Sequence, residues 1–183
     1  MKERPTLETE RLALRPFMLT DAPDVERLAG DRDVAVNTLN IPHPYDQATA
    51  ELWISTHEVS FAVGQQVTFA ITDRATGALM GAISLTINTE HERAELGYWI
   101  GKEFWGCGYT TEAAAVVLRY AFQVLEVNRV FACHFTRNPA SGRVMQKIGM
   151  RYEGRLRQHV KKWGEWEDIE MYSVLREEYG TEG

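Results

Sequence analysis

Residues 97–113 read GYWIGKEFWGCGYTTEA and contain the strongest structural signals in the chain. The first four continue a strand-like run that starts at Ala94, and a glycine-rich turn follows from Gly101 to Gly108. After this turn, apolar residues recur at helical spacing as far as Val124. A strand, a glycine turn and a long amphipathic helix in this order favour an anion site. The free N–H groups of a helix's first turn point at such a ligand, and the helix dipole favours negative charge.

Towards the N-terminus the patterns predict a strand, two helices and a hairpin. We expect a strand over residues 7–17 and a helix with Thr20 as N-cap and Asp21 in its first turn, ending at Gly30. Residues 37–46 are predicted to form a loop, and a second helix is expected from about Gln47 to Val63. The expected apolar stripe of the second helix comprises Leu52, Ile54, Val59, Phe61 and Val63. Strands over 67–72 and 79–87 flank a turn at 73–77 and predict an antiparallel hairpin.

Towards the C-terminus the helix after Gly108 is expected to end near residues 127–128, before a strand over 130–135. Asn138 is a predicted N-cap for a helix that ends at Gly149, and strands over 151–160 and 165–175 surround a turn at 163–164. Residues 94–135 should form a right-handed parallel β-α-β unit with its ligand at the carboxyl end of the first strand. We therefore predict a single α/β (α+β) domain over residues 1–183. Its mixed, mostly antiparallel sheet has about seven strands and is flanked by about four helices.

Composition narrows the classes of function. Of the 183 residues 44% are hydrophobic and 25% charged, which is typical of a globular protein, and the net charge of −6 argues against binding a nucleic-acid backbone. The longest aliphatic run, Ala113 to Leu118, is too short to span a membrane, and the opening MKERPTLETERL has no signal-peptide core. Two cysteines and five scattered histidines match no metal-ligand spacing, so we expect no metal, no disulfide framework and a cytoplasmic location.

The glycine turn excludes two common nucleotide motifs. The run WGCGYT at 105–110 is too short for a Walker loop, lacks its lysine, and lacks the full three-glycine dinucleotide fingerprint. Instead, the chain resembles the GNAT superfamily of N-acetyltransferases, and within it the RimJ/RimL-like branch of ribosomal-protein alanine N-acetyltransferases. Four segments are similar to that branch: ETERLALRPFMLTDA, GYWIGKEFWGCGYTTEA, RNPASGRVMQKIGM and GEWEDIEMYSVLREEY.

The resemblance implies an acetyl-CoA site. The superfamily's pyrophosphate loop falls on residues 105–110, with Trp105 in place of the usual first polar residue and Thr110 in place of the last small one. The strand at residues 98–100 is implied to pair with the pantetheine arm through its backbone, and Asn138 to bond the pantetheine amides. The expected cofactor-binding residues are Tyr98, Trp99, Ile100, Trp105, Gly106, Cys107, Gly108, Tyr109, Thr110, Thr111 and Asn138.

Acetyl transfer requires a group that takes the proton from the amine and a donor for the departing thiolate. Glu95 matches the carboxylate position of the branch and is expected to act as base or amine binder; a solvated strand residue is the alternative. In many members of the superfamily, a tyrosine at the position of Met145 donates a proton to the leaving thiolate. Here Ser141 is the expected proton donor, unless its hydroxyl is hydrogen-bonded locally. Arg137, Arg143 and Lys147 flank this helix and are candidates for phosphate contacts.

The resulting hypothesis is an acetyl-CoA-dependent N-acetyltransferase. Its acceptor is a primary amine, either the α-amine of a (ribosomal) protein or peptide, or a small molecule such as a polyamine or aminoglycoside. Acidic residues of the last hairpin are candidates for attracting a cationic amine: Glu165, Glu167, Asp168 and Glu170. A non-catalytic acyl-CoA-binding module and a nucleotide-binding fold stay open as alternatives. No nucleic-acid or membrane partner is expected, and a homodimer is compatible with the resemblance.

Overall fold

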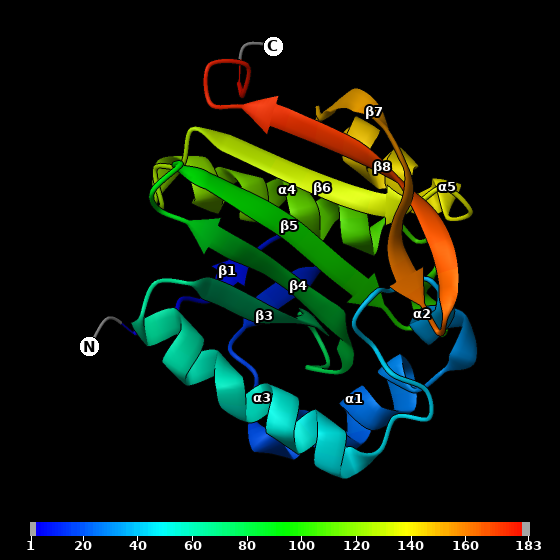
Figure 1. Cartoon of the computed structure of the whole chain (residues 1–183). Coiled ribbons are helices and arrows are strands. Elements are labelled where there is room, and N and C mark those ends of the chain that lie inside the picture. The colour runs from blue at the N-terminus through cyan, green and yellow to red at the C-terminus, as the bar shows by residue number, and fades with distance from the viewer. Residues whose placement is uncertain (1–2, 181–183) are drawn as a thin grey trace.

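The computed structural model describes residues 3–180 as one eight-stranded sheet with helices on both faces (Figure 1). The strands are β1 (Leu7–Glu8), β2 (Leu12–Arg15), β3 (Gln66–Asp73), β4 (Leu79–Asn88), β5 (Arg93–Ile100), β6 (Arg129–Phe135), β7 (Arg151–Lys162) and β8 (Glu165–Leu175). The α-helices are α1 (Ala22–Ala29), α2 (Arg32–Val36), α3 (Gln47–Ala62), α4 (Tyr109–Gln123) and α5 (Pro139–Lys147). This arrangement confirms the predicted mixed fold.

One parallel pair interrupts the otherwise antiparallel sheet. The strand order is β1-β2-β3-β4-β5-β6-β8-β7, and β5 and β6 are the parallel neighbours. Their pairing stops after the pair Glu95 and Phe131, so the remaining five residues of β5 separate from β6. Figure 1 shows the two strands diverging towards their carboxyl ends. The fold therefore opens its sheet at the place where the sequence predicts a ligand.

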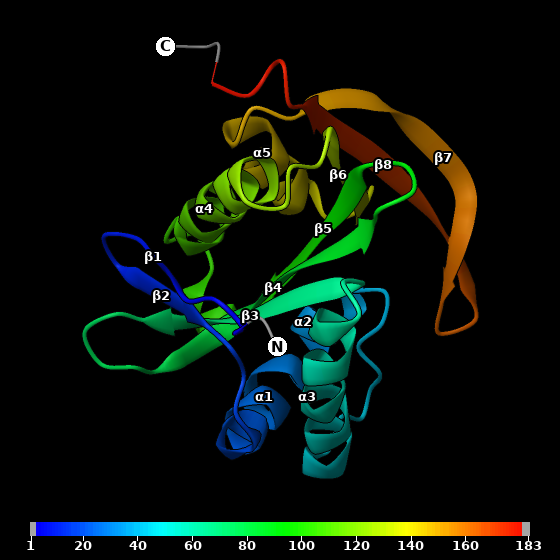
Figure 2. The same ribbon diagram turned by 90° about the vertical axis from the view of Figure 1, so that its left-hand side faces the viewer.

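The two faces of the sheet have separate apolar cores (Figure 2). Helices α4 and α5 pack on one face, and Ala94 and Leu96 of β5 point into this core. Helices α1 and α3 cover the other face, where Trp99 of β5 packs against the second core. Because side chains alternate along a strand, Glu95 lies on the α1–α3 face and Tyr98 on the α4–α5 face. Strand β5 thus contributes residues to both sides of the opening.

The N-terminal region is more finely divided than predicted. The expected strand over residues 7–17 consists of β1 and β2, and α2 is an additional short helix. Thr20 is not an N-cap: it lies in a 3₁₀ turn over Leu19–Asp21, and α1 begins at Ala22. Asp21 accepts two hydrogen bonds of 2.8 Å from the Arg15 guanidinium. The 3₁₀ turn brings the carboxylate back towards β2, which explains the later helix start.

Two expected apolar stripes are partly wrong. Leu52, Val59 and Val63 are exposed, and α3 instead buries Ala50, Ile54 and His57, which are spaced by four and three residues. A histidine therefore belongs to the buried stripe of α3. Val124 is also exposed, because α4 ends at Gln123 rather than near residue 127.

The C-terminal strands confirm the predicted hairpin, with β7 extended to Lys162. Two register shifts, at residues 152–154 and 156–160, bend β7 against β8. In Figure 1 this hairpin curves towards α2 and the segment that follows it. Within residues 3–180, no helix is both long enough and apolar enough to cross a membrane.

Candidate active site

A cavity of about 910 Å³ occupies the gap between β5 and β6. Its walls come from both faces of the sheet: the glycine turn, α4 and α5 on one side, and residues 37–42, α3 and β7 on the other. The predicted site residues that line it are Glu95, Tyr98, Trp99, Ile100, Trp105, Gly106, Gly108, Tyr109, Thr110, Thr111, Asn138 and Ser141. Predicted residues from three segments, namely β5, the glycine turn with the start of α4, and the start of α5, therefore meet at one cavity.

The glycine turn presents free amides to this cavity. Gly106 and Gly108 have φ angles of 75° and 81°, a left-handed conformation that L side chains rarely adopt. The first intrahelical bond of α4 runs from the Glu112 N–H to the Gly108 carbonyl. The N–H groups of residues 109–111 precede that bond and are available to a ligand. With the helix dipole behind them, they fit a pyrophosphate.

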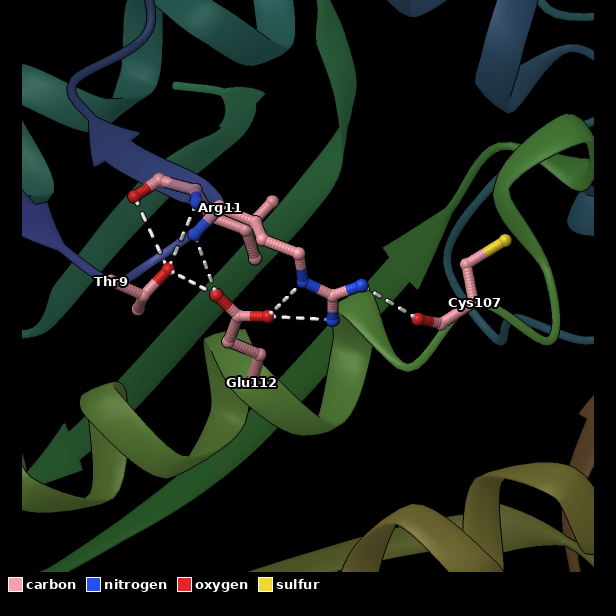
Figure 3. A network of polar contacts seen from close by, with 5 residues as sticks. Thr9, Arg11, Cys107 and Glu112 are labelled. Carbon is pink, nitrogen blue, oxygen red and sulfur yellow. Dashed lines mark hydrogen bonds and ion pairs between the residues drawn. The ribbon is translucent and has the colours of Figure 1, made fainter. Parts of the chain in front are cut away.

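Arg11, directly before β2, fixes the glycine turn from outside the cavity (Figure 3). The Arg11 Nη1 donates to the Cys107 carbonyl at 3.1 Å, and its Nε donates to Glu112 in the first turn of α4 at 2.7 Å. The Thr9 hydroxyl donates to the same carboxylate at 2.6 Å. The guanidinium also lies 4.5 Å from the Tyr109 ring centre. The turn and the first turn of α4 are therefore both attached to the short segment between β1 and β2.

Thr9, Arg11 and Glu112 together form a clamp on the glycine turn. The charges and hydrogen bonds of this clamp favour the ionised state of Glu112. Partial burial alone raises the pKa of Glu112, but hydrogen bonds from Thr9 and Arg11 outweigh it and hold the pKa below its ordinary value. The hydrogen bond between Arg11 and Glu112 also raises the pKa of Arg11. The negative charge near the first turn of α4 is therefore paired with Arg11, so it does not oppose an anion at the cavity end of the turn.

The α5 side of the cavity contains a paired phenol and serine. The Tyr98 hydroxyl lies 2.8 Å from Ser141 Oγ and 3.1 Å from the Ser141 carbonyl. Burial raises the pKa of Tyr98 to about 12, so the phenol stays protonated near neutral pH. Asn138 is the N-cap of α5 and accepts a bond from the Ser141 N–H at 3.4 Å. These contacts fix Ser141 on the first turn of α5, beside the gap in the sheet.

Glu95 contributes the carboxylate of the cavity. It is the last residue of β5 that pairs with β6. Among the described residues that line the cavity, Glu95 is the one with an acidic side chain. Desolvation by the surrounding walls raises the pKa of Glu95, which brings it closer to neutral pH. A carboxylate in this state can accept a proton from a bound amine.

Three predicted residues have specific placements that the sequence did not show. The Trp105 indole N–H donates to the Ile100 carbonyl at 2.9 Å, so this carbonyl already has a partner. Cys107 does not line the cavity, and its exposed thiol lies 3.5 Å from the Trp105 carbonyl. Met145 is 1% exposed and belongs to the core beneath α5. Met145 also lines the cavity, where its thioether has no proton to give.

Most candidate charges near the cavity are already paired. Arg137 contacts Glu167 and the Val36 carbonyl, and Asp168 pairs with Arg155. Glu167 and Asp168 therefore do not present free charge to an amine. Arg143 and Lys147 line the cavity on the α5 side. Over residues 3–180, no group of three or more acidic, histidine or cysteine side chains is arranged to hold a metal ion.

Sequence reasoning missed Arg11 and Glu112 as site residues. They lie 101 positions apart and meet through the packing of β2 beside α4. The available signal was an acidic residue in the first turn of a helix whose N-terminus was predicted to bind an anion. Such a carboxylate needs a cation close by.

Residues 11–151 match the Acetyltransferase (GNAT) domain family. The chain is 33% identical over 175 residues to the uncharacterized N-acetyltransferase p20 of Bacillus licheniformis, covering 95% of this chain and 98% of that protein. It is 30% identical over 73 residues to the [ribosomal protein uS5]-alanine N-acetyltransferase of Escherichia coli, covering 40% of this chain and 38% of that protein. A solved GNAT-family acetyltransferase from Bacillus anthracis superposes with a TM-score of 0.84 at 25% identity, covering 94% of this chain and 99% of that one.

Proposed function

Because the chain belongs to the GNAT acetyltransferase family and is an N-acetyltransferase, we propose that it transfers the acetyl group of acetyl-CoA to the α-amine at the N-terminus of a polypeptide. The observation that supports this choice most directly is that one cavity contains both the free amides of α4 and a single carboxylate, Glu95. The amides fit an anionic donor. One carboxylate fits one ammonium group.

The donor half of the proposal rests on the glycine turn and α5. The amides of residues 109–111 bind the pyrophosphate of acetyl-CoA, and Asn138 and the unpaired edge of β5 receive its pantetheine arm. This places the thioester in the gap between β5 and β6, close to Ser141. Arg143 and Lys147 lie on the same side and supply positive charge for the remaining phosphate.

The acceptor half rests on the opposite wall. Asn37, Thr38 and Asn40 provide amides and a hydroxyl there, and Tyr45 and Trp53 provide aromatic surface. A polyamine or an aminoglycoside carries several ammonium groups and would leave all but one without a carboxylate in this cavity. A polypeptide N-terminus brings one ammonium group followed by peptide groups, which match the polar wall. The name of the Escherichia coli relative, which specifies alanine of a ribosomal protein, agrees with this class of acceptor.

Glu95 is the proposed base. Its raised pKa lets it take the proton of the attacking amine, directly or through one water, while it also attracts the ammonium form on arrival. A backbone N–H near residues 99–100 of β5 is the proposed donor to the oxyanion, because this part of the strand has left β6.

Ser141 is the proposed donor to the leaving thiolate. The one proton of the Tyr98 hydroxyl can go to the Ser141 carbonyl or to Ser141 Oγ. In the second arrangement, which we propose for the reaction, the serine proton is free to point at the sulfur. Tyr98 can do this at neutral pH because its raised pKa keeps it protonated. Met145 has no proton to give and serves packing instead.

The test is release of free CoA thiol with a panel of acceptors at equal concentration. Short peptides beginning with Ala, Ser or Met are compared with spermidine and an aminoglycoside, and each peptide has a control with a blocked N-terminus and one internal lysine. We expect turnover with at least one free α-amine and little with its blocked control. Preferred acetylation of spermidine or the aminoglycoside would contradict the proposed acceptor class, and failure to turn over any amine would contradict the proposed reaction.

We also propose a cytoplasmic location for the enzyme. Cys107 and Cys133 are both free thiols, which agrees with a reducing compartment such as the cytoplasm. Whether two copies associate stays a prediction.

A further inference from the structure

A buried lysine supports one wall of the cavity. Lys162, at the end of β7, is 5% exposed, although lysine is almost never fully buried unless it is paired. Its Nζ donates to the Ile41 carbonyl at 2.6 Å and to the Leu39 carbonyl at 3.2 Å. It forms no ion pair with a carboxylate of the described chain. Two backbone carbonyls therefore solvate this ammonium group, which also lies 4.8 Å from the centre of the Trp163 ring.

The segment that Lys162 binds has few other polar contacts, although Ile41 and Tyr45 pack against the second core. Residues 39–45 form neither a helix nor a strand. Across residues 3–180, the hydrogen bonds of this segment are the two that it accepts from Lys162. His43 adds a ring contact with Trp163, with centres 5.9 Å apart. Leu39, Asn40, Ile41 and Pro42 all line the cavity. One side chain of β7 thus fixes the position of a wall from a distant part of the sequence.

A second cation acts at the start of the same segment. Arg137 donates to the Val36 carbonyl and pairs with Glu167 on β8. This contact attaches the end of α2 to the sheet, and Lys162 attaches the residues beyond it. Burial lowers the pKa of Lys162, and the positive charge of Arg137 lowers it further.

We infer that Lys162 is a positioning residue for the acceptor, since its bonds to residues 39 and 41 hold the wall against which the acceptor amine and its first residues bind. The inference rests on the proposed function for the identity of that half of the cavity. It concerns acceptor binding, because residues 39–42 belong to the wall that the proposed function assigns to the acceptor. Loss of the bonds should loosen the wall and leave the donor side unchanged.

The experiment replaces Lys162 with Met, which keeps the length of the side chain and removes its charge and donors. The matched control is Lys161→Met: Lys161 is the neighbouring residue of β7, is exposed, and contacts the Trp166 ring at 4.5 Å instead of the cavity wall. For the best peptide acceptor of the panel, we expect kcat/KM to fall roughly 10- to 100-fold in Lys162→Met, mainly through KM. The acetyl-CoA Kd should stay within about twofold in both variants, and Lys161→Met should match the native enzyme.

Hydrogen exchange gives a second readout that needs no acceptor. Amides of residues 39–45 should exchange faster in Lys162→Met than in the native protein or Lys161→Met, while amides of α4 stay unchanged. If Lys162→Met does not fold, Lys162→Gln, which keeps neutral donors, should give smaller effects of the same kind.

Unchanged acceptor KM together with unchanged exchange in residues 39–45 would overturn the inference. An equal loss of acetyl-CoA and acceptor binding would also overturn it, because that result indicates a general structural role. If the native protein acetylates no amine, the proposed function fails, and the exchange experiment still decides whether Lys162 holds the wall.

Discussion

Replacing Gly108 with Val separates backbone strain from cofactor binding. Gly108 is the N-cap of α4 with φ 81°, and a side chain added there would first meet Arg11 Nη2 at 3.6 Å. The left-handed conformation costs an L residue about 1–2 kcal/mol, and a β-branched residue more. For a domain of this size, that loss lowers Tm by at least about 2–8 °C. The two methyl groups of valine would also push the Arg11 guanidinium away from the Cys107 carbonyl.

Gly77 provides the matched control. It has φ 76° in the turn between β3 and β4, with no atom within 4 Å of a side chain added there. Gly77→Val therefore carries the same backbone strain without contact with the clamp or the cavity. In the absence of ligand, both variants should lose the stability that the backbone strain costs, with a further loss in Gly108→Val from the displaced Arg11. Only Gly108→Val should lose affinity for acetyl-CoA.

The assay is the rise in Tm with acetyl-CoA at 100 times the native Kd. A ligand at that level stabilises the native protein and Gly77→Val by about 2.7 kcal/mol, which is about 5–11 °C. If Gly108→Val weakens binding 100-fold, the gain falls to about 0.4 kcal/mol, or about 1–2 °C. An equal rise in Tm for both variants would refute the placement of the pyrophosphate at this turn.

Three further predictions concern single side chains. Ser141→Ala should lower turnover roughly 10- to 1,000-fold at nearly constant acetyl-CoA affinity, whereas Met145→Ala, at a buried site, should instead lower the free energy of unfolding by about 2–5 kcal/mol. Steady-state kinetics and urea melts measure both, and normal turnover in Ser141→Ala would remove the serine from the mechanism. Glu95→Gln should lower kcat/KM roughly 100- to 10,000-fold. Because burial raises the pKa of Glu95, the native kcat/KM should rise with pH through a pKa above the ordinary carboxyl value, and a variant that keeps this rise would exclude Glu95 as base. Burial lowers the pKa of His57 to about 4, below its unfolded value of 6.5, so the folded state favours the neutral ring. Stability should be complete above pH 6.5 and fall towards pH 4 by at most about 1.4 kcal/mol per pH unit; urea melts at several pH values should show a smaller slope in His57→Phe, and an equal slope would argue against this role.

The sequence predicted the parts of the site that depend on local patterns. A glycine turn between a strand and an amphipathic helix is a contiguous signal, and it located Gly108 and the free amides of α4 correctly on the cavity. Asn138 as an N-cap is equally local, and the structure confirms it. The resemblance added Glu95 and Ser141, which line the same cavity, although their chemical roles stay predictions.

The contacts that the sequence did not predict are those between distant segments. Lys162 and Ile41 are 121 residues apart, and no periodicity relates a lysine near a turn to a carbonyl in a loop. The predicted apolar stripe of α3 was wrong for a different reason. Its buried face includes His57, and a pattern read from apolar residues alone shifted the face towards Leu52 and Val59, which are exposed.

The clamp between Arg11 and Glu112 also bears on the order of folding. Its two halves are separated by 101 residues, so the glycine turn reaches its final geometry only after β2 has paired with β3 and packed beside α4. Contacts of such long sequence separation form late, because a large loop must first be closed. A nascent chain that has emerged only through α4 contains every residue of the turn, yet the sheet that supports it is incomplete, since β6 and β8 are still missing. We therefore expect acetyl-CoA to act on the completed domain, slowing its unfolding without accelerating the first steps of folding.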